Sequence, residues 1–259
     1  VSQNGIYRLD PAALTNAGIP VSSTDSRFFQ LFFRGEEQYI YVQDNNSNNL
    51  IDGSDYIEFY GQKNDGILDS IMYKGDLYLN PVRQPNPYYS LFNDTSAYFL
   101  TWNNSTSNRR IALSSDTVLS SVPSPTNFFM REEVVENHAT YYYGRSTSTN
   151  INFPEYHEVE GWASTNFYQG NSNTTNFNTS NVYATGSVPA VTVKLAVMGA
   201  SDDASSSQDH NIQIRYKDKT GVYVSLDHPI FDGYRLVDSA YSFSASNMAT
   251  STDIVVSAL

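Results

Sequence analysis

The sequence predicts an all-β protein with two β-rich domains, the second of them a sandwich, and one short helix near the N-terminus. Aromatic residues make up 14% of the 259 residues and charged residues only 16%, a balance that suits half-buried strands better than charged helices. Short apolar runs recur along the chain between clusters of Asn, Asp, Gly and Pro, which favour turns. The length is sufficient for two ordinary domains.

One helix start is well marked near the N-terminus. Asp10 can cap the first turn, Pro11 suits the first helical position, and Gly18 is placed to end the helix. In the rest of the first half, apolar and aromatic runs predict strands, with a hairpin turn at 34–37. The predicted strands cover residues 1–9, 28–33, 39–42, 56–60, 71–73, 97–102 and 110–113.

A Ser-, Thr- and Pro-rich stretch at 114–127 indicates an exposed connector. We therefore expect domains at residues 1–126 and 127–259. In the second domain, alternation predicts that Val191, Val193, Leu195 and Val197 share a core-facing side. Nine short, evenly spaced strands favour a sandwich, at residues 129–136, 139–144, 156–162, 174–179, 190–198, 211–216, 221–226, 235–243 and 253–258.

The stretch from Asp44 to Asp55 has the spacing of a twelve-residue calcium loop, with oxygen side chains at positions 1, 3, 5, 9 and 12. Calcium prefers six to eight oxygen ligands. Asn49 stands at position 6, where glycine is usual, and Asn tolerates the left-handed conformation required there. The predicted structural calcium site consists of Asp44, Asn46, Asn48, the Leu50 carbonyl, Asp52 through water, and Asp55.

The alternative interpretation of this stretch is an Asn/Asp-rich turn whose side chains cap their own backbone. Asp55 replaces the bidentate Glu that is usual at position 12, which should weaken calcium binding. The expected affinity is that of weak extracellular modules, on the order of 10⁻⁴–10⁻³ M.

Composition excludes several classes of protein. The net charge of −12 argues against binding to nucleic acid, and the lack of cysteine excludes a disulfide or a cysteine nucleophile within this chain. No apolar run approaches the roughly 20 residues of a membrane span, and no charged-then-apolar signal segment opens the given sequence, so we expect any export signal to have been removed. Both ends read as strand, so we expect the chain to be a piece of a longer protein.

Two alternative functions are open on the residues alone. Glu158 and Glu160, two apart on a strand, could supply the paired carboxylates of a glycoside hydrolase. Tyr141, Tyr142, Tyr143 and Tyr168 could instead form a platform that binds glycan or protein.

Several motifs resemble the N-terminal region of gingipain-type cysteine peptidases linked to type IX secretion. In the first half they are NGIYRL at 4–9, LFFRG at 31–35, DYIEFYG at 55–61, NPYYSLFNDT at 86–95 and AYFLTW at 97–102. The second half adds REE at 131–133, EVEGW at 158–162 and FDGY at 231–234, which resemble the jelly-roll-like domain that precedes the catalytic domain. The sortase of type IX secretion has a related front end.

This resemblance implies a secreted or cell-surface protein of the Bacteroidetes type. It further implies that the chain is a non-catalytic structural or accessory region whose partner is a downstream peptidase domain of the same polypeptide. No catalytic residue is carried over, because the family's Cys and His lie beyond this region and the chain has no cysteine. The chain itself is expected not to be an enzyme.

Overall fold

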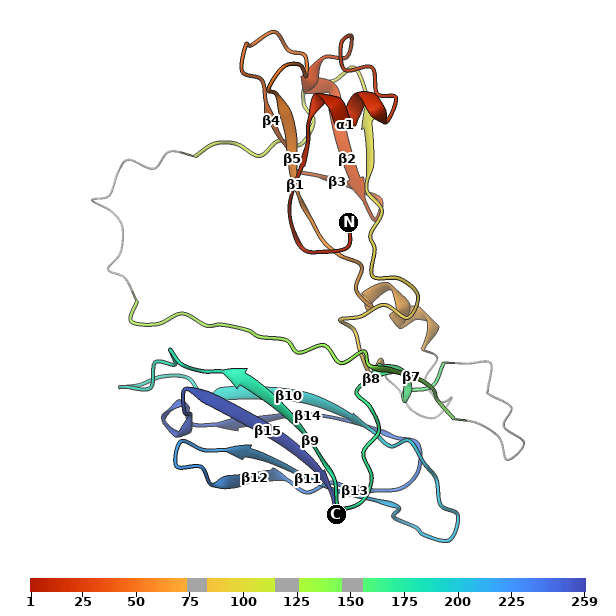
Figure 1. Ribbon diagram of the computed structural model, residues 1–259, viewed down its shortest axis with the longest axis vertical. Coiled ribbons are helices and arrows are strands. Elements are labelled where there is room, and N and C mark those ends of the chain that lie inside the picture. The colour runs from red at the N-terminus through yellow and green to blue at the C-terminus, as the bar shows by residue number, and fades with distance from the viewer. Residues whose placement is uncertain (74–82, 115–125, 146–155) are drawn as a thin grey trace. The chain divides into compact units, whose positions relative to one another are not determined.

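The computed structural model describes residues 1–73, 83–114, 126–145 and 156–259, and Figure 1 shows short strands joined by long loops. The strands pair antiparallel in several separate sheets, so the all-β prediction is confirmed. The chain forms two compact units. The N-terminal unit comprises Val1–Asn64 and Phe92–Pro123, and the C-terminal unit comprises Asp65–Leu91 and Ser124–Leu259.

Two three-stranded sheets form the N-terminal unit. One has the order β1 (Gly5–Leu9), β5 (Tyr56–Gly61) and β4 (Tyr41–Gln43), and the other β3 (Glu36–Gln38), β2 (Phe29–Phe33) and β6 (Phe99–Trp102). Arg34 and Gly35 connect β2 to β3 with φ of 50° and 83°. Positive φ at both central residues matches the right-handed twist of a hairpin. A hairpin is confirmed here, but its turn is shorter than the predicted 34–37 because Glu36 and Glu37 belong to β3. The strand predicted at 39–42 is not its second arm, since β4 pairs with β5.

The short helix α1 (Pro11–Asn16) begins as predicted. The Asp10 carboxylate accepts the Ala13 N–H at 2.7 Å, which satisfies one of the free donors of the first turn. Gly18 follows the helix with φ of 79°. The helix buries Leu14, which fixes it against the sheets.

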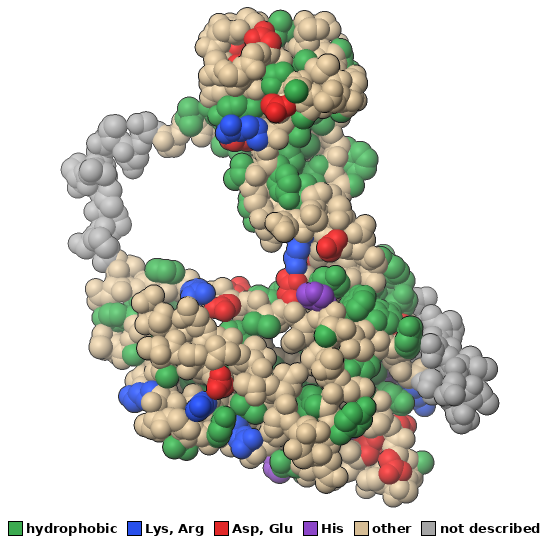
Figure 2. Space-filling view, in the orientation of Figure 1, with side chains coloured by type: hydrophobic (Ala, Val, Ile, Leu, Met, Phe, Trp, Pro, Cys, Tyr) green, Lys and Arg blue, Asp and Glu red, His purple; other side chains and the backbone are tan. Residues whose placement is uncertain are grey.

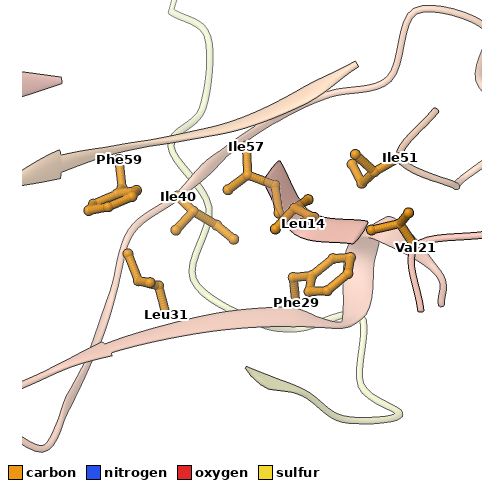
Figure 3. Packing of buried hydrophobic residues seen from close by; sticks show 8 residues of the cluster. All are labelled: Leu14, Val21, Phe29, Leu31, Ile40, Ile51, Ile57 and Phe59. Atoms are coloured by element: carbon orange, nitrogen blue, oxygen red, sulfur yellow. The ribbon is translucent and has the colours of Figure 1, made fainter. Parts of the chain in front are cut away.

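Eight buried side chains form the core of the N-terminal unit. Figure 3 shows them facing one another from the two sheets, the helix and the connecting loops: Leu14, Val21, Phe29, Leu31, Ile40, Ile51, Ile57 and Phe59. Ile51 is 1% exposed and belongs to the predicted calcium loop. The loop is thus anchored to the core through its eighth position.

The C-terminal unit contains two sheets that pack face to face. In one, β10 (Val191–Met198) pairs with β14 (Leu236–Phe243). The larger sheet has the order β12 (Tyr223–Asp227), β11 (His210–Lys217), β15 (Ser251–Ala258) and β9 (Ser172–Asn178), with β13 (Ile230–Phe231) also paired to β11. This arrangement is sandwich-like, as predicted.

Alternation along β10 directs one face of that strand into the sandwich. Leu195 and Val197 pack against a cluster that contains Ile212, Ile214 and Phe231, and Val191 and Val193 pack against a second cluster around Tyr216, Phe243 and Ile254. Thr192 and Lys194 are exposed. The predicted core-facing side of β10 is confirmed.

A small hairpin of β7 (Thr140–Tyr143) and β8 (Glu160–Ala163) completes the C-terminal unit together with Asp65–Leu91. Tyr73, 2% exposed, donates its hydroxyl to the Glu160 carbonyl at 2.7 Å. The Asn86 side-chain amide donates to the carbonyls of Asn137 and Trp162. These hydrogen bonds hold Asp65–Leu91 against the hairpin.

Three predicted strands and the domain division need correction. Of the strand predicted at 71–73, residues 71–72 end a 3₁₀ helix, Ile67–Met72, and Tyr73 forms only an isolated bridge with Tyr156. Residues 110–113 contribute only an isolated bridge between Ile40 and Arg110, and 129–136 form no strand. The division at 126/127 placed 65–91 in the first domain, whereas Asp65–Leu91 groups with the C-terminal unit because its partners lie in the hairpin.

Candidate functional site

The loop from Asp44 to Asp55 is held by its own side-chain oxygens. Asp44 accepts the N–H groups of Asn48 and Asn49 at 3.3 and 2.8 Å, and Asn48 accepts the Leu50 N–H at 2.8 Å. The Asn46 oxygen accepts the Asn48 N–H at 3.2 Å. The oxygens at positions 1, 3 and 5 therefore all turn toward the loop backbone that surrounds them.

Asp52 lies opposite these residues. Its carboxylate accepts the side-chain amides of Asn46 at 3.0 Å and Asn48 at 2.7 Å. Positions 3, 5 and 9 of the predicted calcium loop are thereby brought together. A cation could replace these amide donors if the two Asn side chains presented their oxygens instead, since amide oxygen is a calcium ligand.

Asp55 has a different environment from the other predicted ligands. It is 2% exposed, and its two oxygens accept the N–H groups of Asn45 at 2.8 Å and Asp52 at 3.1 Å. The hydrogen bond from Asn45, followed by the one from Asp52, lowers the pKa of this carboxyl against the opposing effect of burial. Its oxygens stabilise the loop closure, which limits what they can offer a cation.

Three residues with positive φ shape the loop backbone. Asn49 at position 6 has φ of 60°, the left-handed conformation that the calcium-loop interpretation requires there. Ser47 and Gly53 also have positive φ, 57° and 53°. A self-capped turn would form the same hydrogen bonds between side-chain oxygens and backbone N–H groups, so the bonding pattern is common to both interpretations.

Carboxylates gather more closely elsewhere. Asp202, Asp209 and Asp232 each offer an oxygen within 4.8 Å of the others, whereas, among the described residues, Asp44, Asp52 and Asp55 form no such group. Asp209 also accepts the N–H groups of Asp203 and Gly233 at 3.0 and 2.8 Å.

Sequence reasoning missed this acidic triad. Its members are 7 and 23 residues apart, with no local spacing that marks a metal site. The only sequence signal is an Asp in each of two loops of the sandwich, at 202 and 232, and one directly before β11, at 209. The strand order must be known before these positions can be brought to one end of the sandwich.

The two carboxylates of the hydrolase hypothesis make separate structural contacts. Glu158 accepts the Leu236 N–H at 3.0 Å, at the start of β14. Glu160 accepts the Tyr141 hydroxyl at 3.1 Å, and burial raises its pKa. Each carboxylate thus already holds another element of the C-terminal unit.

The four tyrosines of the predicted platform divide into two pairs. Tyr141 and Tyr142 are half-buried, and their hydroxyls donate to Glu160 and to the Ser164 carbonyl. Tyr143 and Tyr168 are 67% and 70% exposed. A row of ring contacts reaches from exposed His138 through Tyr89, Trp162 and Tyr141 to Tyr143.

On the face drawn in Figure 2, Lys and Arg side chains are scattered and form no continuous stripe. Within the described ranges, none of the helices has the length and apolar character needed to cross a membrane.

Comparison of the chain with family models, curated proteins and solved structures finds no match in any of the three.

Proposed function

We propose that this chain is a non-catalytic structural and accessory region of a secreted or cell-surface gingipain-type cysteine peptidase, in which a calcium ion braces the 44–55 loop. The observation that supports calcium binding is the conformation of this loop. Its oxygen side chains at positions 1, 3 and 5 turn inward, Asn49 adopts the left-handed conformation, and Ile51 fixes the loop to the core.

Asp44, Asn46, Asn48 and the Leu50 carbonyl would hold the ion, with Asp52 acting through water and Asp55 as a weak contributor. Calcium would neutralise Asp44 and join the loop to strands β4 and β5, which flank it on either side. Binding to the folded state alone stabilises that state by mass action, so the role is structural and not catalytic.

Calcium-dependent unfolding tests this step. We expect calcium to raise the melting temperature of the chain, and chelator to reverse the effect. Asp44→Asn should abolish the calcium response, while Asp202→Asn, which removes a carboxylate from the acidic triad, should leave it intact. A melting temperature that calcium and chelator leave unchanged would support the self-capped turn instead.

The wider role rests on the motif resemblance and on the sandwich-like C-terminal unit, for which we propose jelly-roll topology. The sequence encoded downstream tests it. A domain with a catalytic Cys and His there would support the proposal, and a downstream region without one would contradict it.

A glycan- or protein-binding function is the second candidate, favoured by the exposed rings of Tyr143 and Tyr168. A glycan array probed with the whole chain distinguishes the two. Binding that Tyr143→Ala removes would favour recognition over a purely structural role.

A further inference from the structure

A pocket of about 300 Å³ opens in the N-terminal unit beside the 44–55 loop. That volume is at the lower end of what small-molecule sites occupy. Its walls come from the 3₁₀ turn before β2, from the start of β4, from the loop, and from the residues that bridge to Ile40. They include Arg27, Tyr41, Asp44, Asn49, Arg110 and Ile111.

Arg110 is the unusual member of this lining. Its Nη2 donates to the carbonyls of Arg27 at 2.7 Å and Phe29 at 2.9 Å, and its Nη1 donates to the Arg109 carbonyl. In the described part of the chain, no carboxylate forms an ion pair with it. Burial lowers its pKa, but a guanidinium remains protonated in proteins.

Besides Arg110, the pocket lining contains two charged side chains, Arg27 and Asp44. Arg27 pairs with Asp25, and Asp44 carries the remaining negative charge of the lining. Asp44 is also the first residue of the proposed calcium loop. When calcium neutralises Asp44, the guanidinium of Arg110 keeps no opposite charge within the lining. Its own hydrogen bonds reach only neutral carbonyls, and Glu37, whose charge also acts on it, is not a lining residue.

We propose that this pocket binds a small ligand through a carboxylate, which lies against the guanidinium of Arg110 while the Tyr41 ring and Ile111 contact the ligand's apolar part. Arginine is suited to carboxylate because charge-assisted hydrogen bonds are stronger than neutral ones. Calcium strengthens binding by removing the opposing charge of Asp44, and the ligand strengthens calcium binding by the same factor. This calcium coupling rests on the proposed function, whereas the Arg110 contact does not.

A matched pair of probes tests the charge requirement. N-acetylglycine and its neutral amide, N-acetylglycinamide, are titrated into the ¹⁵N-labelled chain with calcium present, followed by amide chemical shifts. We expect saturable shifts at residues 26–27, 41–44, 49 and 110–111 with the acid, and binding of the amide weaker by about tenfold or more. Equal binding of the two probes, or shifts outside these residues only, would overturn the proposal.

A matched pair of variants tests the location. Ile111→Asp places a negative charge in the pocket wall at a side chain that is 43% exposed, and Leu113→Asp places the same charge two residues further on, at 85% exposure. We expect Ile111→Asp to weaken N-acetylglycine binding about tenfold or more, and Leu113→Asp to leave it within about twofold. Equal loss in both variants would contradict the assignment, and their amide spectra report whether each variant is folded.

Repeating the titration with chelator separates this proposal from the calcium loop. If calcium shifts the melting temperature but the acid binds no better than the amide, the pocket proposal fails alone. If calcium has no effect on melting while Ile111→Asp still removes N-acetylglycine binding, the loop proposal fails and the Arg110 site stands.

Discussion

Asp55 is a buried carboxylate without an ion-pair partner among the described residues. Burying a charge is costly unless hydrogen bonds replace its hydration. The N–H groups of Asn45 and Asp52 do so here, one for each oxygen. A single side chain therefore closes the loop from both ends, independently of any cation.

Replacing this carboxylate should destabilise the N-terminal unit. An amide in Asp55→Asn keeps one acceptor and sets an N–H₂ group against a backbone N–H. We expect a loss of about 1–3 kcal/mol in the free energy of unfolding, measured by denaturant titration in chelator. Glu36→Gln, which neutralises an exposed carboxylate of the same unit, serves as the control and should change stability by less than about 0.5 kcal/mol.

The lowered pKa of the Asp55 carboxyl also sets the direction in which the stability of the N-terminal unit changes with pH. Its pKa is lowered in the folded state, chiefly by the Asn45 hydrogen bond. The stabilising contribution is thus complete above the unfolded-state pKa of about 3.9 and is lost as the pH falls through the lower folded-state value. Melting temperatures recorded downward from pH 5 should fall more steeply for the wild type than for Asp55→Asn. Parallel curves would contradict this prediction.

In the C-terminal unit, we expect Glu160 to give stability the opposite dependence on pH. Burial raises its pKa, so the folded state favours the protonated form. Its contribution to stability is present below the unfolded-state pKa of about 4.3 and is lost as the pH rises through the higher folded-state value. The protection of the β7–β8 amides, taken relative to the exchange of the unfolded chain at each pH, should therefore fall across that range, and Glu160→Gln should flatten the dependence. An unchanged dependence in the variant would assign it to another group.

At the scale of elements, the β7–β8 hairpin shows why a two-stranded ribbon needs support from elsewhere. Such ribbons are marginally stable by themselves. Gly161 in β8 has φ of 136°, and a Cβ there would lie 3.0 Å from the Tyr73 hydroxyl oxygen. The hairpin and the 65–91 segment therefore fit only with glycine at this point.

Removal of the Tyr73 hydroxyl should loosen this junction. Tyr73→Phe keeps the ring but leaves the Glu160 carbonyl without its 2.7 Å hydrogen bond. We expect about 1–2 kcal/mol of destabilisation in denaturant titration and faster amide exchange in β7 and β8. Tyr168→Phe, at an exposed tyrosine, is the control. Equal effects of the two substitutions would show that the buried hydroxyl has no special role.

Elements with a strong local pattern were predictable from sequence, and those that depend on distant partners were not. Alternation marked β10, and the Asp10 cap marked α1, because both signals are local. Residues 129–136 carry apolar residues of high strand propensity but form no strand, because propensity alone does not create a sheet. Spacing likewise located the 44–55 loop, but not the burial of Asp55, which requires the folded core.

At the scale of the whole molecule, the division into two units follows side-chain partners instead of chain order. Most of the Ser-, Thr- and Pro-rich connector predicted at 114–127 lies outside the described residues. Nothing in the composition of 65–91 shows that Tyr73 and Asn86 bind the hairpin. The membership of 65–91 in the C-terminal unit leaves no sequence signal, because each of its residues would also suit an ordinary loop of the N-terminal unit.

Matched core substitutions test whether the two units, which are separate in their contacts, also unfold independently of each other. Ile57 and Ile214 are each fully buried, one in the core of the N-terminal unit and one in the sandwich. Truncation of either to Ala removes buried methyl groups and leaves a cavity, at a cost of about 2–5 kcal/mol.

Hydrogen exchange followed by mass spectrometry should therefore show faster exchange mainly in Val1–Asn64 for Ile57→Ala. For Ile214→Ala the faster exchange should include Asp65–Leu91 together with the sandwich, since that segment belongs to the same unit. Exchange of 65–91 that instead follows Ile57→Ala would contradict the assignment of this segment to the C-terminal unit.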